Sequence, residues 1–74
     1  MLQNDTSAIE IVVNGQARAV PSGQTILGLV ESLGLKPDRV AVEMDRRIVK
    51  RAEWTVAPLR PGVKIEIVQF VGGG

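Results

Sequence analysis

The sequence predicts a small α+β domain in which a single helix covers one face of a mixed β-sheet. Three observations support this fold class: an early hairpin signal, one amphipathic helical stripe, and alternating apolar residues in a late strand. Neither a helix nor a sheet can bury its apolar side alone, so the two are expected to pack on each other. A chain of 74 residues has room for one such domain.

A β-hairpin is predicted over residues 8–20. Three apolar residues alternate onto one face of its first strand: Ile9, Ile11 and Val13. Glu10 falls on the other face. The pair Asn14-Gly15 follows, and these residue types accept the positive φ angles that a two-residue type I′ turn requires at both positions.

A helix is predicted before Pro37. Its apolar stripe has the spacing i, i+3, i+4, i+7: Ile26, Leu29, Val30 and Leu33. Ser22 or Thr25 is expected to cap its start, and Gly34 suits the left-handed position just past its end. Pro37 blocks continuation. Gly28 inside the helix costs roughly 1 kcal/mol relative to Ala. Two explanations stay open for this glycine: a close approach of the helix to the sheet, or an exposed position in which the residue has no role.

Two further strands are predicted in the second half of the chain. In "RVAVEM", residues 39–44, one face carries Val40, Val42 and Met44. In "VKIEIVQFV", residues 63–71, one face carries Ile65, Ile67 and Gln69. Because the first and last strands are both rich in Ile and Val, we expect them to lie in the centre of the sheet and to pair.

Residues 45–62 connect these two strands. "DRRIV" is typical of a turn and a short strand, and the irregular stretch after it is expected to anchor Trp54 and Leu59 in the core. If the last strand runs parallel to the first, the fold is a ubiquitin-like β-grasp, a sheet of four to five strands gripping one helix. We expect this domain over residues 8–71, with a flexible amino-terminal segment at 1–7 and a flexible glycine tail at 72–74.

The composition argues against several classes of function. Without cysteine there is no disulfide, thiolate metal site or cysteine nucleophile, and without histidine the commonest general base and metal ligand is missing. The eight acidic residues are scattered singly, so we predict neither an active site nor a metal site. A net charge of +1 and short apolar runs favour neither nucleic acid nor membrane as a partner. The polar amino end lacks the apolar core of a signal peptide, so a cytoplasmic protein is expected.

A basic cluster lies at Arg46, Arg47, Lys50 and Arg51, close to Trp54. Binding of nucleic acid would call for more charge and more aromatic platforms than one Trp and one Phe. A solvated turn explains the cluster better. An edge that docks on an acidic partner surface stays open as a third interpretation.

The closing sequence "IVQFVGGG" carries the strongest functional signal. Glycines lose much backbone freedom on ordering, so this run cannot stabilise the fold. A tail without β-carbons can instead thread a narrow channel, and three extended glycines reach about 10 Å. Fixing them costs about 1–2 kcal/mol per residue, so a surface of the folded body has to supply the affinity. The sequence therefore predicts a carrier or modifier with a reactive carboxylate at Gly74.

These features together resemble the ubiquitin-like sulfur carriers, and most closely the ThiS family of thiamine biosynthesis. The resemblance spans residues 9–74 through "IVVNGQ", "GQTILGLVESLGL", "VAVEMDRRIVKRAEW" and "IVQFVGGG". In the third segment, Asp45 stands where an asparagine is usual in that family and Lys50 where a proline is usual. Pro61-Gly62-Val63 stands where Gly-Asp is frequent. None of these departures touches the tail.

The resemblance implies a protein co-substrate without catalytic residues of its own. An E1-like adenylating enzyme of the ThiF type would activate the Gly74 carboxylate with ATP and Mg²⁺ bound to that enzyme. Sulfur, relayed as a persulfide from a cysteine desulfurase, would displace AMP, and a thiazole synthase of the ThiG type would accept it from the thiocarboxylate. Five further residues are implied in partner contact: Gly72 and Gly73 in threading, and Val71, Phe70 and Arg51 in docking.

Three alternatives stay open. The chain could carry sulfur for another product, such as molybdopterin, thiolated tRNA or an amino-acid pathway. It could be a ubiquitin-like modifier that forms isopeptide bonds through Gly74. It could also be a plain β-grasp interaction module whose glycines have no role.

Overall fold

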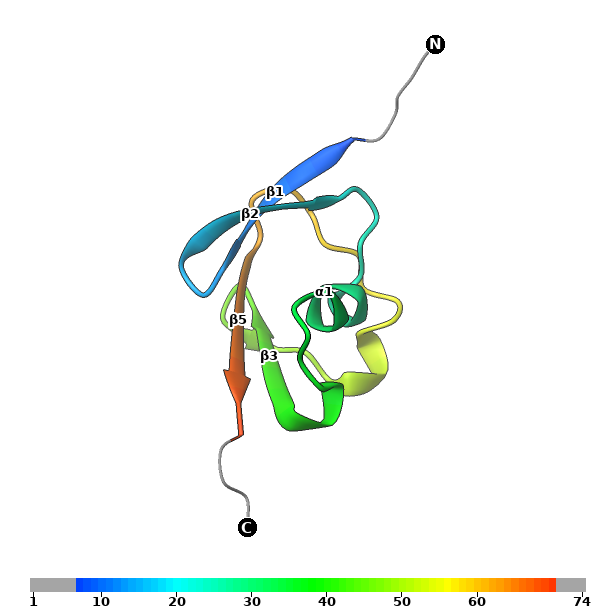
Figure 1. Ribbon diagram of the computed structural model, residues 1–74, viewed down its shortest axis with the longest axis vertical. Coiled ribbons are helices and arrows are strands. Elements are labelled where there is room, and N and C mark those ends of the chain that lie inside the picture. Colours follow the sequence, from blue (N-terminus) through cyan, green and yellow to red (C-terminus); the bar gives the residue numbers. More distant parts are fainter. Residues whose placement is uncertain (1–6, 71–74) are drawn as a thin grey trace.

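A five-stranded mixed sheet and one α-helix make up the fold (Figure 1). The computed structural model describes residues 7–70. The strands are β1 (Ala8–Val13), β2 (Gln16–Pro21), β3 (Val40–Met44), β4 (Arg47–Ile48) and β5 (Lys64–Gln69). The helices are α1 (Ile26–Ser32) and two short 3₁₀ helices, η1 (Pro37–Arg39) and η2 (Arg51–Glu53). Residues 1–6 and 71–74 lie outside the described range, so the expected amino-terminal segment and glycine tail stay predictions.

The strand order β2-β1-β5-β3-β4 confirms the predicted β-grasp. β5 runs parallel to β1, with Val12 beside Lys64 and Val13 beside Ile65. On its other edge β5 runs antiparallel to β3. The first and last strands of the chain therefore pair in the interior of the sheet, as their Ile and Val content predicted.

The hairpin forms as expected from its turn residues. Asn14 has a φ of 50° and Gly15 a φ of 84°, which are the left-handed values that a type I′ turn requires. The register that follows places Val13 opposite Gln16 and Ala8 opposite Pro21. Ile11 and Val13 face the helix and are buried, while Glu10 is exposed on the other side.

Thr25, one of the two residues predicted to cap helix α1, is its N-cap. The Gly28 N–H donates to Thr25 Oγ1 at 3.1 Å, so Thr25 and not Ser22 caps the helix. Gly34 takes the expected left-handed φ of 76° after the helix ends. Pro37 does more than block continuation, because it occupies the first turn of η1.

Of the two explanations for Gly28, a close approach of the helix to the sheet is wrong. A β-carbon at this position would meet the Gln24 side chain at 3.2 Å and Thr25 Oγ1 at 3.5 Å. Both neighbours belong to the start of the helix itself. The glycine therefore leaves room for the capping region and not for a strand.

The segment between β4 and β5 closes the core from the same side as α1 (Figure 1, yellow). Trp54 and Leu59 are buried in it, as predicted. The indole Nε1–H of Trp54 donates to the Val49 carbonyl at 2.9 Å, and the Trp54 carbonyl accepts from the Leu27 N–H at 3.1 Å. All buried residues in the described range are hydrophobic, so these hydrogen bonds supply the polar contacts that an irregular buried segment needs.

The turn between β3 and β4 uses two non-glycine residues in the left-handed region. Asp45 has a φ of 50° and Arg46 a φ of 72°. Asp45 tolerates this conformation, and its side chain stabilises the turn because Oδ1 accepts from the Lys64 N–H at 3.0 Å. The Asp45 N–H in turn donates to the Lys64 carbonyl at 2.8 Å. The turn is thereby fixed to the start of β5.

Candidate functional site

The end of β5 is the part of the candidate site that the structure describes. Phe70 directly follows the strand, and its N–H donates to the Arg39 carbonyl at 2.8 Å. The Phe70 side chain is 55 % exposed. Four of the predicted site residues lie outside the described range: Val71, Gly72, Gly73 and Gly74. The chain is therefore held by backbone hydrogen bonding up to the residue before them.

Asn14 fixes β5 in a way that the sequence did not indicate. Its Oδ1 accepts from the Ile67 N–H at 2.8 Å, and its Nδ2 donates to the Ile67 carbonyl at 3.2 Å. The Asn14 N–H also donates to the Ile65 carbonyl at 2.8 Å. Because β1 ends at Val13, the amide side chain replaces the next pair of ladder hydrogen bonds. β5 is thus held on both edges to within three residues of Phe70.

We predict that Asn14→Gly lowers the free energy of unfolding by about 1–3 kcal/mol, because Ile67 loses both side-chain hydrogen bonds. Glycine keeps the positive φ of the turn, so the loss reports on the side chain and not on backbone strain. Urea unfolding followed by far-ultraviolet circular dichroism measures it. Asn14→Asp keeps the acceptor but removes the donor, and we expect an intermediate loss. An Asn14→Gly variant as stable as the parent would contradict this role.

Arg51 and Phe70 are not brought together by the fold. Arg51 lies in η2, where its guanidinium stacks on the Trp54 ring at 5.3 Å from the centroid. This segment lies on the helix side of the sheet (Figure 1). Phe70 continues the alternation of β5 on the side opposite to buried Ile67. The two residues expected in docking therefore belong to different faces of the domain.

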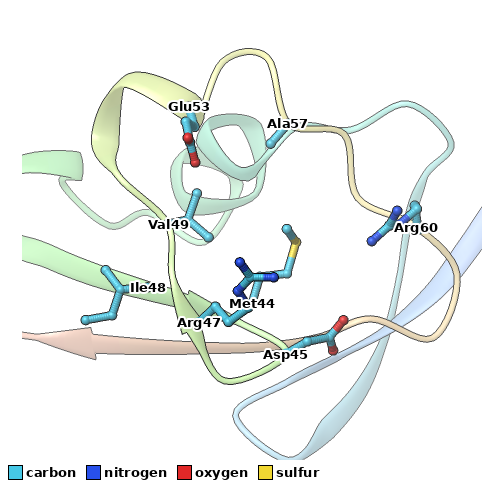
Figure 2. A pocket seen from close by; sticks show the side chains of 8 residues that line it. All are labelled: Met44, Asp45, Arg47, Ile48, Val49, Glu53, Ala57 and Arg60. Carbon is cyan, nitrogen blue, oxygen red and sulfur yellow. The ribbon is translucent and has the colours of Figure 1, made fainter.

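One residue of the basic cluster, Arg47, lines a small cavity of about 230 Å³ (Figure 2). Its wall includes the apolar side chains of Met44, Val49 and Ala57. Arg47 and Arg60 approach the opening from different sides, and the carboxylates of Asp45 and Glu53 also line it. Two positive and two negative groups balance, so the cavity has no clear preference for an anion. The predicted basic residues of the cluster are all exposed: Arg46, Arg47, Lys50 and Arg51.

Between Ser7 and Phe70, no group of three or more His, Cys, Asp or Glu side chains is placed to hold a metal ion. Over the same range, no helix has the length and apolar character needed to cross a bilayer.

The sequence matches the model of the ThiS family over residues 9–74. It is 30 % identical over 66 residues to the sulfur carrier protein ThiS of Escherichia coli. That match covers 89 % of this chain and the whole of the relative.

Two longer proteins also match. The thiazole synthase of Magnetococcus marinus is 36 % identical over 66 residues, and that of Paramagnetospirillum magneticum is 35 % identical over the same length. Each match covers 89 % of this chain but only 20 % of the relative. The chain therefore spans about a fifth of the length of these two enzymes.

Among solved structures, the fold is similar to that of a thiamine biosynthesis protein (ThiS) from Geobacter metallireducens. Its crystal structure superposes with a TM-score of 0.76 at 23 % identity, covering 89 % of this chain and all of the other. A solution structure of a thiamine biosynthesis protein from the same organism gives a TM-score of 0.72 at 23 % identity, covering 89 % of this chain and 88 % of the other. These likenesses support the β-grasp fold independently of the strand pattern.

Proposed function

The chain belongs to the ThiS family, and we propose that it is a sulfur carrier protein of thiamine biosynthesis that acts as a co-substrate and not as an enzyme. The observation that carries this proposal is the match to the sulfur carrier of E. coli along that protein's whole length. The family match extends to residue 74, so it includes the glycine tail. The reactive group in this proposal is the carboxylate of Gly74.

Three chemical steps convert this carboxylate to a thiocarboxylate. In the first, a carboxylate oxygen attacks the α-phosphorus of ATP and pyrophosphate leaves, which gives an acyl adenylate. In the second, the terminal sulfur of a persulfide attacks the carbonyl carbon and AMP leaves, which gives an acyl disulfide. In the third, a thiol attacks the other sulfur of this acyl disulfide, forms a new disulfide with it, and releases the thiocarboxylate. Activation is needed because an ionised carboxylate resists nucleophilic attack.

The described residues support a carrier role because they hold the strand that leads to the tail. Backbone hydrogen bonds to β3 and the Asn14 side chain fix β5 up to Ile67, and Arg39 fixes Phe70. A rigid strand of this kind limits where the following residues can reach. In this proposal Gly72 and Gly73 thread into the partner, while Val71 and Phe70 lie where the tail leaves the body.

The partners follow from the proposed chemistry. An adenylating enzyme of the ThiF type would hold ATP and Mg²⁺, and a cysteine desulfurase would supply sulfur indirectly. A thiazole synthase of the ThiG type would accept the sulfur. Two thiazole synthases each contain a segment, about a fifth of their length, that matches this chain. This supports the partnership with thiazole synthase, since fused domains tend to act on each other. We place this exchange in the cytoplasm.

The proposal is tested by incubating the chain with its adenylating enzyme, ATP, Mg²⁺, a cysteine desulfurase and cysteine. We expect intact-protein mass spectrometry to show a mass increase equal to the replacement of one oxygen by sulfur, located at Gly74 by fragmentation. Omission of ATP is the matched control and is expected to leave the mass unchanged. A complete reaction mixture that never produces this increase would refute the carrier role.

A second measurement separates thiamine biosynthesis from the other sulfur-carrying pathways. We expect the thiocarboxylated chain to bind thiazole synthase and support thiazole formation, and to show no comparable binding to the large subunit of molybdopterin synthase. Preference for the latter enzyme would keep the carrier chemistry but reassign the pathway.

A further inference from the structure

The hairpin turn at Asn14-Gly15 has a reactivity that the carrier role does not use. When glycine follows asparagine, the glycine backbone nitrogen can attack the side-chain carbonyl carbon Cγ, because no β-carbon hinders the approach. A five-membered succinimide forms and ammonia leaves. Water then opens the ring at one of its two carbonyls, which gives aspartate or isoaspartate. The conversion consumes one water, releases one ammonia, and needs neither an enzyme nor an oxidant.

The surroundings of the turn leave the attacking nitrogen accessible. Asn14 and Gly15 are both exposed, so water reaches them. A β-carbon at Gly15 would meet no heavy atom within 4 Å, so no neighbouring element packs on the turn there. Within residues 7–70, no backbone carbonyl accepts a hydrogen bond from the Gly15 N–H. Asn4, the other asparagine of the sequence, precedes Asp5, whose side chain hinders the same attack.

The fold instead restrains the group that is attacked. The Asn14 carboxamide is held at both ends, because Oδ1 accepts from the Ile67 N–H at 2.8 Å and Nδ2 donates to the Ile67 carbonyl at 3.2 Å. Ring closure requires Cγ to turn from β5 toward the Gly15 nitrogen, so both hydrogen bonds have to break first. The reaction therefore depends on a local opening between the turn and β5.

Neither product can restore these contacts. Aspartate keeps an acceptor for the Ile67 N–H, but its second oxygen faces the Ile67 carbonyl without a proton to donate. Isoaspartate leads the main chain through Cβ and Cγ, which lengthens a loop whose two residues match a type I′ turn. Both products therefore weaken the hold of the turn on β5.

We propose that Asn14 is a site of spontaneous deamidation, that its hydrogen bonds to Ile67 slow the reaction, and that its conversion loosens β5 and impairs delivery of the tail. The effect on the tail rests on the proposed carrier function, whereas the reaction itself does not. The new carboxylate also cancels the formal net charge of +1, which makes the product separable by ion exchange.

The first test compares the folded chain with the chain unfolded in guanidinium chloride, at the same mildly alkaline pH. Peptide mapping by mass spectrometry is expected to show the change from amide to acid at Asn14, with isoaspartate identified by fragmentation. We expect the folded chain to react about 10- to 100-fold more slowly, because two hydrogen bonds have to break. The Asn14→Asp variant is the matched control and gains no further mass in this peptide. Equal rates in both states would contradict the restraint by Ile67.

The second test asks whether the opening is local. Breaking the contact between the turn and β5 exposes little surface, so the rate is expected to stay nearly constant at guanidinium chloride concentrations below the unfolding transition. A rate that instead rises in parallel with the global unfolding equilibrium would show that only the unfolded chain reacts. That result would overturn the site in the native domain.

The third test measures the effect on the carrier. We expect the isoaspartate form, purified by ion exchange, to show a lower melting temperature and a several-fold lower kcat/KM for thiocarboxylate formation. Asn14→Asp has the new charge but a normal main chain, and it is expected to lie between this form and the parent. Parent values in the isoaspartate form would overturn the effect on the tail.

These measurements also separate the inference from the proposed function. A parent chain that is never converted to the thiocarboxylate contradicts the carrier role, while the deamidation rates still decide the chemistry at Asn14. A parent chain that is converted normally but shows equal deamidation rates in its folded and unfolded states contradicts only this inference.

Discussion

Removal of Gly73 and Gly74 is expected to abolish thiocarboxylate formation while the domain stays folded. The truncated chain would still present a carboxylate, at Gly72, but two residues, or about 7 Å, short of the active site that forms the adenylate. Reacting groups have to approach within about 3–3.5 Å, so a deficit of this size removes the reaction and does not merely slow it. Intact-protein mass spectrometry after reaction with the adenylating enzyme and sulfur source measures the loss.

The fold is expected to tolerate this truncation because its core ends earlier. Within the described range the last buried residue is Ile67, and the last backbone hydrogen bond found there is made by Phe70. Circular dichroism and the melting temperature should therefore match those of the parent. Gly73→Ala is a milder test of the same role, since one added methyl group is expected to slow thiocarboxylate formation strongly without changing stability. Charging of the truncated chain at the parent rate would contradict the role of the tail.

A division of labour between body and tail follows from these expectations. The tail lacks side chains, so it can enter a narrow channel but contributes little binding energy. The folded body exposes the apolar side chains of Val68 and Phe70 near the end of β5, and exposed apolar area of this kind is typical of surfaces that supply affinity. The side chain of Asn14 connects the folded body to the tail, because its hydrogen bonds to Ile67 fix β5, the strand that leads to the tail.

Local signals in the sequence were sufficient for most of the fold. Asn14-Gly15 predicted the hairpin turn, Gly34 marked the end of the helix and Ser22 or Thr25 its start, and the burial of Trp54 followed from its large apolar side chain. Each of these depends on residues close together in the chain, or on a simple preference for burial. The pairing of β1 with β5 was predicted from composition, since both strands are rich in Ile and Val.

Contacts between distant residues were beyond such signals. The side chain of Asn14 bonds a backbone group 53 positions later, and its turn preference already explained its presence. The opposition of Glu43 and Glu66 depends on the register of β3 and β5, which alternation alone does not give, because a shift of two residues preserves the faces. Arg51 and Phe70 were both expected in partner docking, and their positions on different faces of the domain also depend on contacts between distant residues.

Replacement of Trp54 by alanine is expected to have the largest effect on stability, a loss of about 3–5 kcal/mol in the free energy of unfolding. The side chain is only 2 % exposed, so its removal leaves a large cavity. The Val49 carbonyl also loses the indole donor. A domain of this length has roughly 4–11 kcal/mol of stability in total, so the variant should be substantially destabilised or unfolded at room temperature.

Trp54→Phe separates the two contributions. Phenylalanine keeps most of the apolar volume but cannot donate to the Val49 carbonyl, so we expect a smaller loss, with about 1–3 kcal/mol from the unpaired acceptor. Because Trp54 is the single tryptophan, far-ultraviolet circular dichroism has to replace fluorescence as the probe in urea unfolding. Val56→Ala controls for loss of an exposed side chain on the same segment. If Trp54→Ala unfolds at the parent's urea midpoint, the segment between β4 and β5 is not anchored by the indole.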